Sequence, residues 1–370
     1  MAMKKTVFYL ALSAIFCLLA SGNAWAMHIS EGILPMKWAG LWYLIALPFV
    51  IKGIKDIKKK TEINPHFKVL LGLMGAVVFI ISCMPVPVPT AGTCSHPAGT
   101  GISAVLVGPV MSILVTSIAL LIQALFLAHG GLTTWGADIV SMGVMGSFAA
   151  YFSFRILQKL KAPLFLCGFI AGLLADWATY ATTSFELASA LHGSKSMLSL
   201  FYTILVAFIP TQLPLGILEG FLTGGMVVFV YKRRPDILSQ LSVISCQPSA
   251  KKKMKEKIKI VLFAFLVTSL LFLAVSRKLS AESWKGVDVN VVEKFAQEQG
   301  RPAWTPFINT DQGDLLLFVF LLAGTAGGFM AGFCWRKLFY PPTSAIVSEA
   351  NEGGLRRTRR SEAQAGENKR

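Results

Sequence analysis

Five histidines are the side chains in this sequence best suited to binding a metal: His28, His66, His96, His129 and His192. His28 follows Met27, so cleavage after Ala26 would make it the second residue of the mature chain. The free α-amine of Met27, the amide nitrogen of His28 and its imidazole Nδ1 would then close two adjacent chelate rings around one ion. A deprotonated amide in such a set suits the square-planar geometry of Ni(II) or Cu(II), and less readily Co(II). His96 could supply a fourth nitrogen; alternatively, His28 is a frayed terminal residue and His96 an ordinary loop histidine.

Several motifs of enzymatic chemistry are absent from the sequence. There is no G-x-x-x-x-G-K-[ST] phosphate-binding loop, so this chain does not hydrolyse nucleotides itself. Neither H-E-x-x-H nor G-x-S-x-G occurs, which argues against an intramembrane hydrolase. A metal-dependent enzyme would also need an open coordination position and a general base, and the sequence indicates neither. We therefore expect a protein that binds a metal without transforming a substrate.

The composition indicates the class of protein that would hold such a metal site. Of 370 residues, 54% are hydrophobic and only 15% are charged, and the mean hydropathy is +0.61, which is typical of a polytopic membrane protein. The net charge of +16 comes from 35 basic and 19 acidic residues. Because the basic residues cluster in short runs between apolar segments, they are typical of cytoplasmic loops and not of a nucleic-acid-binding face. Six cysteines are too few for a disulfide scaffold.

The first 26 residues have the pattern of a secretory signal peptide. Lys4 and Lys5 precede an apolar stretch at 7–20 that is too short to span a bilayer comfortably. The small residues of Ala24-Trp25-Ala26 then supply a cleavage site. Cleavage there would free the amine of Met27, whereas an uncleaved first helix would remove that ligand.

Apolar segments and basic runs together predict the topology. The apolar stretches expected to be helical are 38–51, 68–84, 102–128, 139–154, 163–180, 198–231, 260–275 and 315–334. The stretch 102–128 is interrupted by Gly108-Pro109 and must cross twice or not at all, since a single pass would put the basic run at 155–161 outside. We therefore expect an all-α polytopic membrane protein, with a bundle of about seven helices that includes a broken or re-entrant segment. A C-terminal two-helix transmembrane hairpin should follow it.

This pattern divides the chain into five parts. After the signal peptide at 1–26, we expect a metal-binding transmembrane module at 27–235 and a basic cytoplasmic linker at 236–259. The hairpin occupies 260–337 with an external loop at 276–314, and a disordered cytoplasmic tail follows at 338–370. The mature N-terminus should then lie outside and the C-terminus in the cytoplasm.

Three motifs in the first module resemble one known family. Residues 27–35, Met-His-Ile-Ser-Glu-Gly-Ile-Leu-Pro, resemble the opening M-H-I-x-E-G-x-L-P of the substrate-binding membrane subunits of nickel and cobalt energy-coupling-factor transporters (CbiM/NikM). Residues 95–101, Ser-His-Pro-Ala-Gly-Thr-Gly, resemble that family's H-P-x-G-T-G loop. Residues 129–143 resemble its G-G-x-T-T-x-G-A-N…S-M-G stretch, although Asp138 stands where asparagine is more usual. The resemblance covers about residues 27–235.

The resemblance implies a substrate, a ligand set and partners. In that family the N-terminal amine, the amide and imidazole of the second residue and the loop histidine hold Ni²⁺ or Co²⁺, which maps here onto Met27, His28 and His96. His129 and Asp138 would be able to orient a ligand. The implied partners are a transmembrane coupling subunit and two ATPase subunits in the cell inner membrane. Segment 260–337 resembles the family's two-helix accessory subunit (CbiN/NikN-like), which would either help to load the metal or only stabilise the complex.

Other polar residues in apolar surroundings have more than one interpretation. Asp176 and Glu219 lie within apolar stretches, where they could contact a partner subunit, contact the metal or be buried in hydrogen bonds. Cys94 could be a soft ligand or pair with Cys83. The predicted function is metal capture at the outer face for an ATP-driven nickel or cobalt importer. The alternative is a membrane metal sensor or metal-assembly protein that does not transport.

Overall fold

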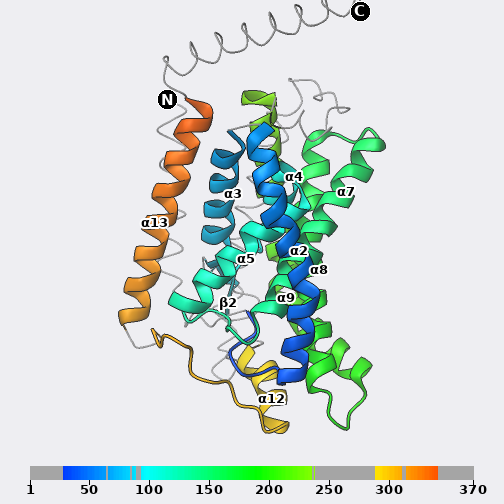
Figure 1. Cartoon of the computed structure of the whole chain (residues 1–370). Helices are drawn as coiled ribbons and strands as arrows, with labels where there is room; N and C mark the ends of the chain where they lie inside the picture. The colour runs from blue at the N-terminus through cyan, green and yellow to red at the C-terminus, as the bar shows by residue number, and fades with distance from the viewer. Residues whose placement is uncertain are drawn as a thin grey trace, which may run out of the picture.

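The computed structural model describes residues 28–63, 66–83, 86–88, 93–235, 237, 288–310 and 314–340, and these parts are nearly all helical (Figure 1). The α-helices are α2 (Met36–Ile63), α3 (His66–Cys83), α4 (Thr100–Val107), α5 (Pro109–Phe126), α6 (Trp135–Asp138), α7 (Ser147–Lys159), α8 (Leu164–Leu191), α9 (Met197–Arg233), α12 (Lys294–Glu298) and α13 (Asp314–Phe339). Two π-helical stretches are η1 (Ile139–Gly146) and η2 (Asp288–Glu293). The strands β1 (Val86–Val88) and β2 (Thr93–Ser95) form a small antiparallel pair. The prediction of a helical membrane protein is confirmed.

Five helical segments in the described ranges are long and apolar enough to cross a membrane: Pro109–Phe126, Trp135–Lys159, Leu164–Leu191, Met197–Arg233 and Phe318–Phe339. The second of these joins α6, η1 and α7 into one span. Many large apolar side chains on these segments point away from the protein; Ile118, Phe152 and Leu321, for example, are each more than half exposed. Such exposure is expected where lipid, and not water, surrounds a helix.

The apolar stretch at 102–128 is broken where the sequence predicts. Gly108 ends α4 with φ 86° and ψ 159°, a conformation open mainly to glycine, and Pro109 begins α5. His96 precedes α4 and His129 follows α5, and their ring centroids are only 4.9 Å apart. The α4–α5 unit therefore leaves one end of the bundle and returns to the same end, so it is re-entrant and makes no net crossing.

The basic ends of four helices gather at the end of the bundle opposite these histidines. The last turns of α2, α7, α9 and α13 each carry lysine or arginine, and in Figure 1 these ends lie toward the top. Arg234, directly after α9, donates a hydrogen bond to the carbonyl of Leu338 in α13. This contact joins the basic ends of the first module and the C-terminal segment.

Close packing of α8 against α9 forms the middle of the bundle. Small residues permit it: a Cβ added to Gly172 would lie 2.6 Å from the carbonyl oxygen of Glu219, and one added to Gly168 would lie 2.8 Å from the Cα of Gly224. Glycine at helix crossings lets backbones approach closely, as is common between transmembrane helices. The approach brings the polar side chains of both helices beneath the histidine end.

The C-terminal helix α13 lies alongside α3 (Figure 1). A Cβ added to Gly72 of α3 would be 3.2 Å from Sγ of Cys334, so these helices also meet through a small residue. The predicted signal peptide at 1–26, Met27, the first hairpin helix at 260–275 and most of the linker and tail lie outside the described residues. The helix predicted at 315–334 corresponds to α13, and the segment 288–310 precedes it.

Candidate metal site

Three buried imidazoles meet at one end of the bundle. His28 comes from the segment before α2, His96 from the loop between β2 and α4, and His129 from the loop between α5 and α6. The ring centroid of His28 lies 4.7 Å from that of His96 and 4.6 Å from that of His129. Each side chain is at most 7% exposed, and one potential ligand nitrogen from each ring lies within 4.8 Å of the others. Clustered imidazole nitrogens suit Zn, Cu, Ni, Fe or Co, and not Mg²⁺ or Ca²⁺.

A chain of hydrogen bonds fixes which nitrogen of His28 is free. The hydroxyl of Ser82 donates to the carbonyl of Val78 at 2.7 Å, so it accepts from the Gln123 amide Nε2 at 2.7 Å. The Gln123 amide oxygen therefore faces His28 Nε2 at 3.0 Å and must receive its proton. The lone pair of His28 is then on Nδ1. Such outer partners set the tautomer of a metal-binding histidine.

The His96 ring is oriented in the same way. Its Nδ1 lies 3.3 Å from the carbonyl oxygen of Pro97, which can only accept, so Nδ1 carries the proton. Nε2 then holds the lone pair, and this buried atom has no hydrogen-bond partner in the part of the chain that the structure describes. The hydroxyl of Tyr180 on α8 donates to the His96 carbonyl at 3.3 Å and holds the backbone beneath the ring.

Burial keeps the three imidazoles neutral. It lowers the pKa of His96 to about 4, with a small opposing effect from the Pro97 carbonyl. It also lowers the pKa of His28 and of His129 well below 6.5, and the neighbouring histidines add to both shifts. A neutral imidazole has a lone pair to offer, so protons scarcely compete with a metal for these nitrogens near neutral pH.

The His96 loop rests on the polar side chains of α9. One carboxylate oxygen of Glu219 accepts the amide of Ala98 at 2.8 Å and the other that of Gly101 at 3.4 Å. Gln212, about two turns before Glu219 in α9, donates to the hydroxyl of Ser95 at 2.8 Å. Among the interpretations of Glu219, the structure shows the buried hydrogen-bonded one, and its role is to hold the loop that carries His96.

Glu31 fastens the segment that carries His28. Its carboxylate accepts the backbone amide of Leu132 and that of Thr133, the latter at 3.0 Å. In return, the hydroxyl of Thr134 donates to the carbonyl of Ile29 at 2.6 Å. The M-H-I-x-E-G and G-G-x-T-T motifs are thus two halves of one clamp, which brings His28 and His129 together.

Asp138 supports the same segment from α6. Its Oδ1 accepts the amide of Ile29, directly after His28, at 3.3 Å. Gly130 has φ 84°, and a Cβ there would lie 3.2 Å from Cβ of His28 and 3.4 Å from Oδ2 of Asp138. A side chain at this position would separate the three residues, so glycine is needed for both its conformation and its size.

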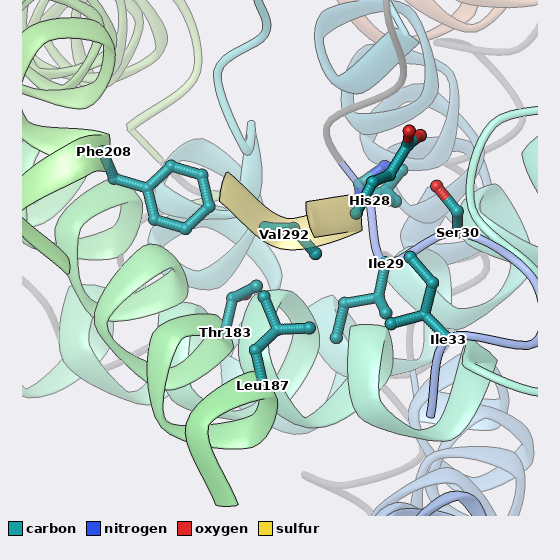
Figure 2. A pocket seen from close by; sticks show the side chains of 9 residues that line it. His28, Ile29, Ser30, Ile33, Thr183, Leu187, Phe208 and Val292 are labelled. Atoms are coloured by element: carbon teal, nitrogen blue, oxygen red, sulfur yellow. The ribbon is translucent and has the colours of Figure 1, made fainter. Parts of the chain in front are cut away.

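The segment 288–310 contacts the segments that carry His28 and His129. The amide of Trp304 donates to the carbonyl of Glu31 at 2.8 Å, and Thr310 donates to the carbonyl of Phe126 at 3.3 Å. Figure 2 shows Val292 between His28 on one side and Phe208 on the other, in the lining of a small cavity next to His28. This cavity has a free volume of only about 10 Å³, room for about one water molecule.

A family comparison agrees with this architecture. Residues 28–237 match the family described as "Cobalt uptake substrate-specific transmembrane region" (CbiM). The chain belongs to the CbiM family. It is therefore a membrane component of metal uptake rather than an enzyme.

Individual relatives extend the match beyond that region. A protein of Geobacter sulfurreducens named "Cobalt transport protein CbiM" is 57% identical over 338 residues, 91% of this chain and 97% of its own length. One of the same name from Sorangium cellulosum is 55% identical over 60% of this chain and its whole length. A solved structure entitled "Crystal Structure of an transition metal transporter" aligns at 24% identity with a TM-score of 0.48, over 58% of this chain and 98% of that one.

Not every predicted residue of this CbiM-family chain falls in the cluster. Met27 lies outside the described residues, so the structure leaves its amine undescribed. His192 follows α8 and does not belong to the cluster, and Cys83 is a free buried thiol. Asp176 is fully buried beside Glu219 and contacts neither His28 nor His96 by any described hydrogen bond.

Three residues that position the site were not predicted for that role: Glu31, Gln123 and Tyr180. Gln123 is the one amide side chain in the apolar helix α5, where an unpaired amide would be expensive. An amide side chain within an apolar helix was therefore the sequence feature that could have indicated the role of Gln123. Glu31 stood within a recognised motif, but nothing in the motif states what its carboxylate contacts.

Proposed function

We propose that this chain captures Ni²⁺ or Co²⁺ at the outer face of the cell inner membrane as the substrate-binding component of an ATP-driven importer. The observation that carries the proposal is the cluster of three buried imidazoles, in which the hydrogen bonds of His28 and His96 leave Nδ1 and Nε2, respectively, free. Soft or borderline metals prefer such nitrogens, while Mg²⁺ and Ca²⁺ prefer oxygen.

The tautomer of His28 supports an N-terminal chelate. Gln123 occupies Nε2 and leaves Nδ1, the ring nitrogen that is able to close a six-membered ring with the amide nitrogen of the same residue. A cleaved Met27 would add its amine, and His96 Nε2 would complete a plane of four nitrogens. Extending the mature terminus by one residue should then abolish high-affinity binding, and unchanged affinity would refute the chelate.

The distribution of charge supports the proposed orientation. Four basic helix ends lie opposite the histidines. Because basic loops stay in the cytoplasm, the histidine end should face outward and the C-terminus inward. Metal would then enter from the outer side and leave toward the basic end.

Energy must come from other proteins. The sequence contains no phosphate-binding loop, so we propose that a transmembrane coupling subunit and two ATPase subunits drive the cycle. The relatives named cobalt transport proteins support a transport role. ATP-dependent metal accumulation in cells that carry these partners is the test, and its absence would favour a sensor or assembly protein.

The segment 288–310 has a proposed role in metal loading. Its Val292 and Glu293 line a small cavity that also touches His28, and we expect the segment to move before a hydrated ion reaches the histidines. Trp304 packs on Gly32, where an added Cβ would lie within 2.7 Å of three indole atoms. Trp304→Ala should loosen this contact and speed metal exchange, measured by stopped-flow competition with a chelator. An unchanged rate would leave this segment only a stabilising role.

The first test of the whole proposal is a native intact mass of the protein purified from membranes. A chain that begins at Met27 with one nickel or cobalt ion is expected. A chain that keeps residues 1–26 would remove the amine ligand and overturn the chelate. An ion of another element would overturn the substrate assignment.

A further inference from the structure

His129 is the third imidazole of the cluster, and the proposed plane of four nitrogen ligands does not include it. Its ring centroid lies 4.6 Å from that of His28 and 4.9 Å from that of His96, so it is as close to each as they are to one another. Its Nε2 is buried and has no hydrogen-bond partner within the described ranges. A buried polar atom without a partner is expensive, and metal coordination is one way to satisfy it.

The backbone around His129 is held in an uncommon conformation. Ala128 has φ 49° and Gly130 has φ 84°, so both neighbours of His129 are left-handed. For alanine this conformation costs about 1–2 kcal/mol, because Cβ crowds the following carbonyl. Such outliers persist where the surroundings impose them, often at ligand sites. The turn also directs the His129 amide to the carbonyl of Gln123, whose side chain orients His28.

The angle between the ring planes of His28 and His129 suits a donor that approaches the metal from above or below the plane of the other ligands. The planes of His28 and His129 meet at 82°. In the proposed chelate, the His28 ring lies close to the plane of the metal and its four nitrogens. A fifth nitrogen must therefore approach from above or below that plane, and a ring nearly perpendicular to the chelating ring suits this approach.

We infer that His129 is itself a metal ligand, the axial fifth donor above the plane of Met27, His28 and His96, and that it favours cobalt(II) relative to nickel(II). This inference rests on the proposed function. Four strong nitrogens in a plane satisfy Ni(II), which accepts square-planar coordination. Compared with Ni(II), Co(II) is stabilised less by four planar nitrogens and more by an additional axial imidazole. His129 thus adjusts the choice of metal while the planar ligands supply most of the affinity.

The direct test counts imidazoles on cobalt in the purified full-length protein. X-ray absorption of the wild type loaded with cobalt(II) chloride should show three imidazoles, and His129→Phe should show two. Two imidazoles in the wild type would overturn the inference without any variant. A wild type that binds neither cobalt nor nickel would overturn the proposed function instead.

A competition titration tests the selectivity. His129→Phe and His129→Gln should weaken cobalt binding about ten-fold, equivalent to ~1.4 kcal/mol, and nickel binding much less. His192→Phe, at a histidine outside the cluster, is the matched control and should change neither. Equal losses for both metals, with the same imidazole count on cobalt in the wild type and in His129→Gln, would make His129 a positioning residue and overturn the inference. Using two variants guards against a folding defect in one of them.

Discussion

Replacing Glu31 with glutamine tests whether the clamp between the two motifs positions the metal ligand. The carboxylate is 8% exposed and accepts two backbone amides, those of Leu132 and Thr133. Glutamine has nearly the same shape but only one acceptor oxygen, so one amide would face an NH₂ group. A buried donor left without a partner costs about 1–3 kcal/mol. If the segment that carries His28 and Glu31 instead detaches from Leu132 and Thr133 in the metal-free protein, metal binding must order it again. A free-energy cost of that size would weaken metal affinity by about 5- to 150-fold.

The assay is a competition titration of cobalt(II) or nickel(II) against a chelator, with the thermal unfolding midpoint measured in parallel. Asp56→Asn is the matched control, because that carboxylate forms a surface ion pair with Lys52 at 3.3 Å within α2, toward the basic end of the bundle. Surface pairs contribute little, so affinity should change less than about two-fold in the control. Wild-type affinity in Glu31→Gln would refute the idea that this clamp sets the position of His28.

Three further predictions concern the same site. Gln123→Leu removes the acceptor that fixes the tautomer of His28 and should weaken metal binding about 10- to 100-fold in the same titration. Gly131→Ala would place a Cβ 2.6 Å from Cα of Glu31 and should cost about 1–3 kcal/mol of stability, seen as a lower unfolding midpoint; an unchanged midpoint would contradict the close contact. Because burial lowers the pKa of His96 to about 4 and lowers those of His28 and His129 well below 6.5, the imidazoles release no protons on binding near pH 7. The logarithm of affinity should then rise with pH with a slope of about two, from the amine and amide alone; a slope of four or five would show that the imidazoles are protonated.

The apolar segments and their breaks were predictable because they depend on local chemistry. Gly108 and Pro109 break the stretch at 102–128 because of their own backbone preferences, which do not depend on the surrounding structure. Basic residues next to apolar stretches likewise predict which helix ends lie together. Even the small β1–β2 pair, which the sequence did not predict, leaves this helical arrangement unchanged.

The partners of polar side chains inside the bundle were not predictable in the same way. Glu219 was expected to contact a partner subunit, the metal or buried hydrogen-bonding groups, and its carboxylate turned out to hold the amides of Ala98 and Gly101. Those amides are more than 115 residues away along the chain. No local pattern specifies such a pairing, since it depends on how α9 packs against the His96 loop.

The sequence by itself determined the class of protein, the break at Gly108 and the choice of His28 and His96 as candidate nitrogen ligands. Residue type and spacing suffice for these, because hydrophobicity, backbone preference and ligand chemistry belong to the residues themselves. Only the tertiary structure decided which ring nitrogens are free, and that His129 stands beside the other two histidines. The tautomer of His28 and the proximity of the three rings depend on contacts between segments about 30 to 100 residues apart, and these contacts exist only after the re-entrant unit has returned its two ends to the same place.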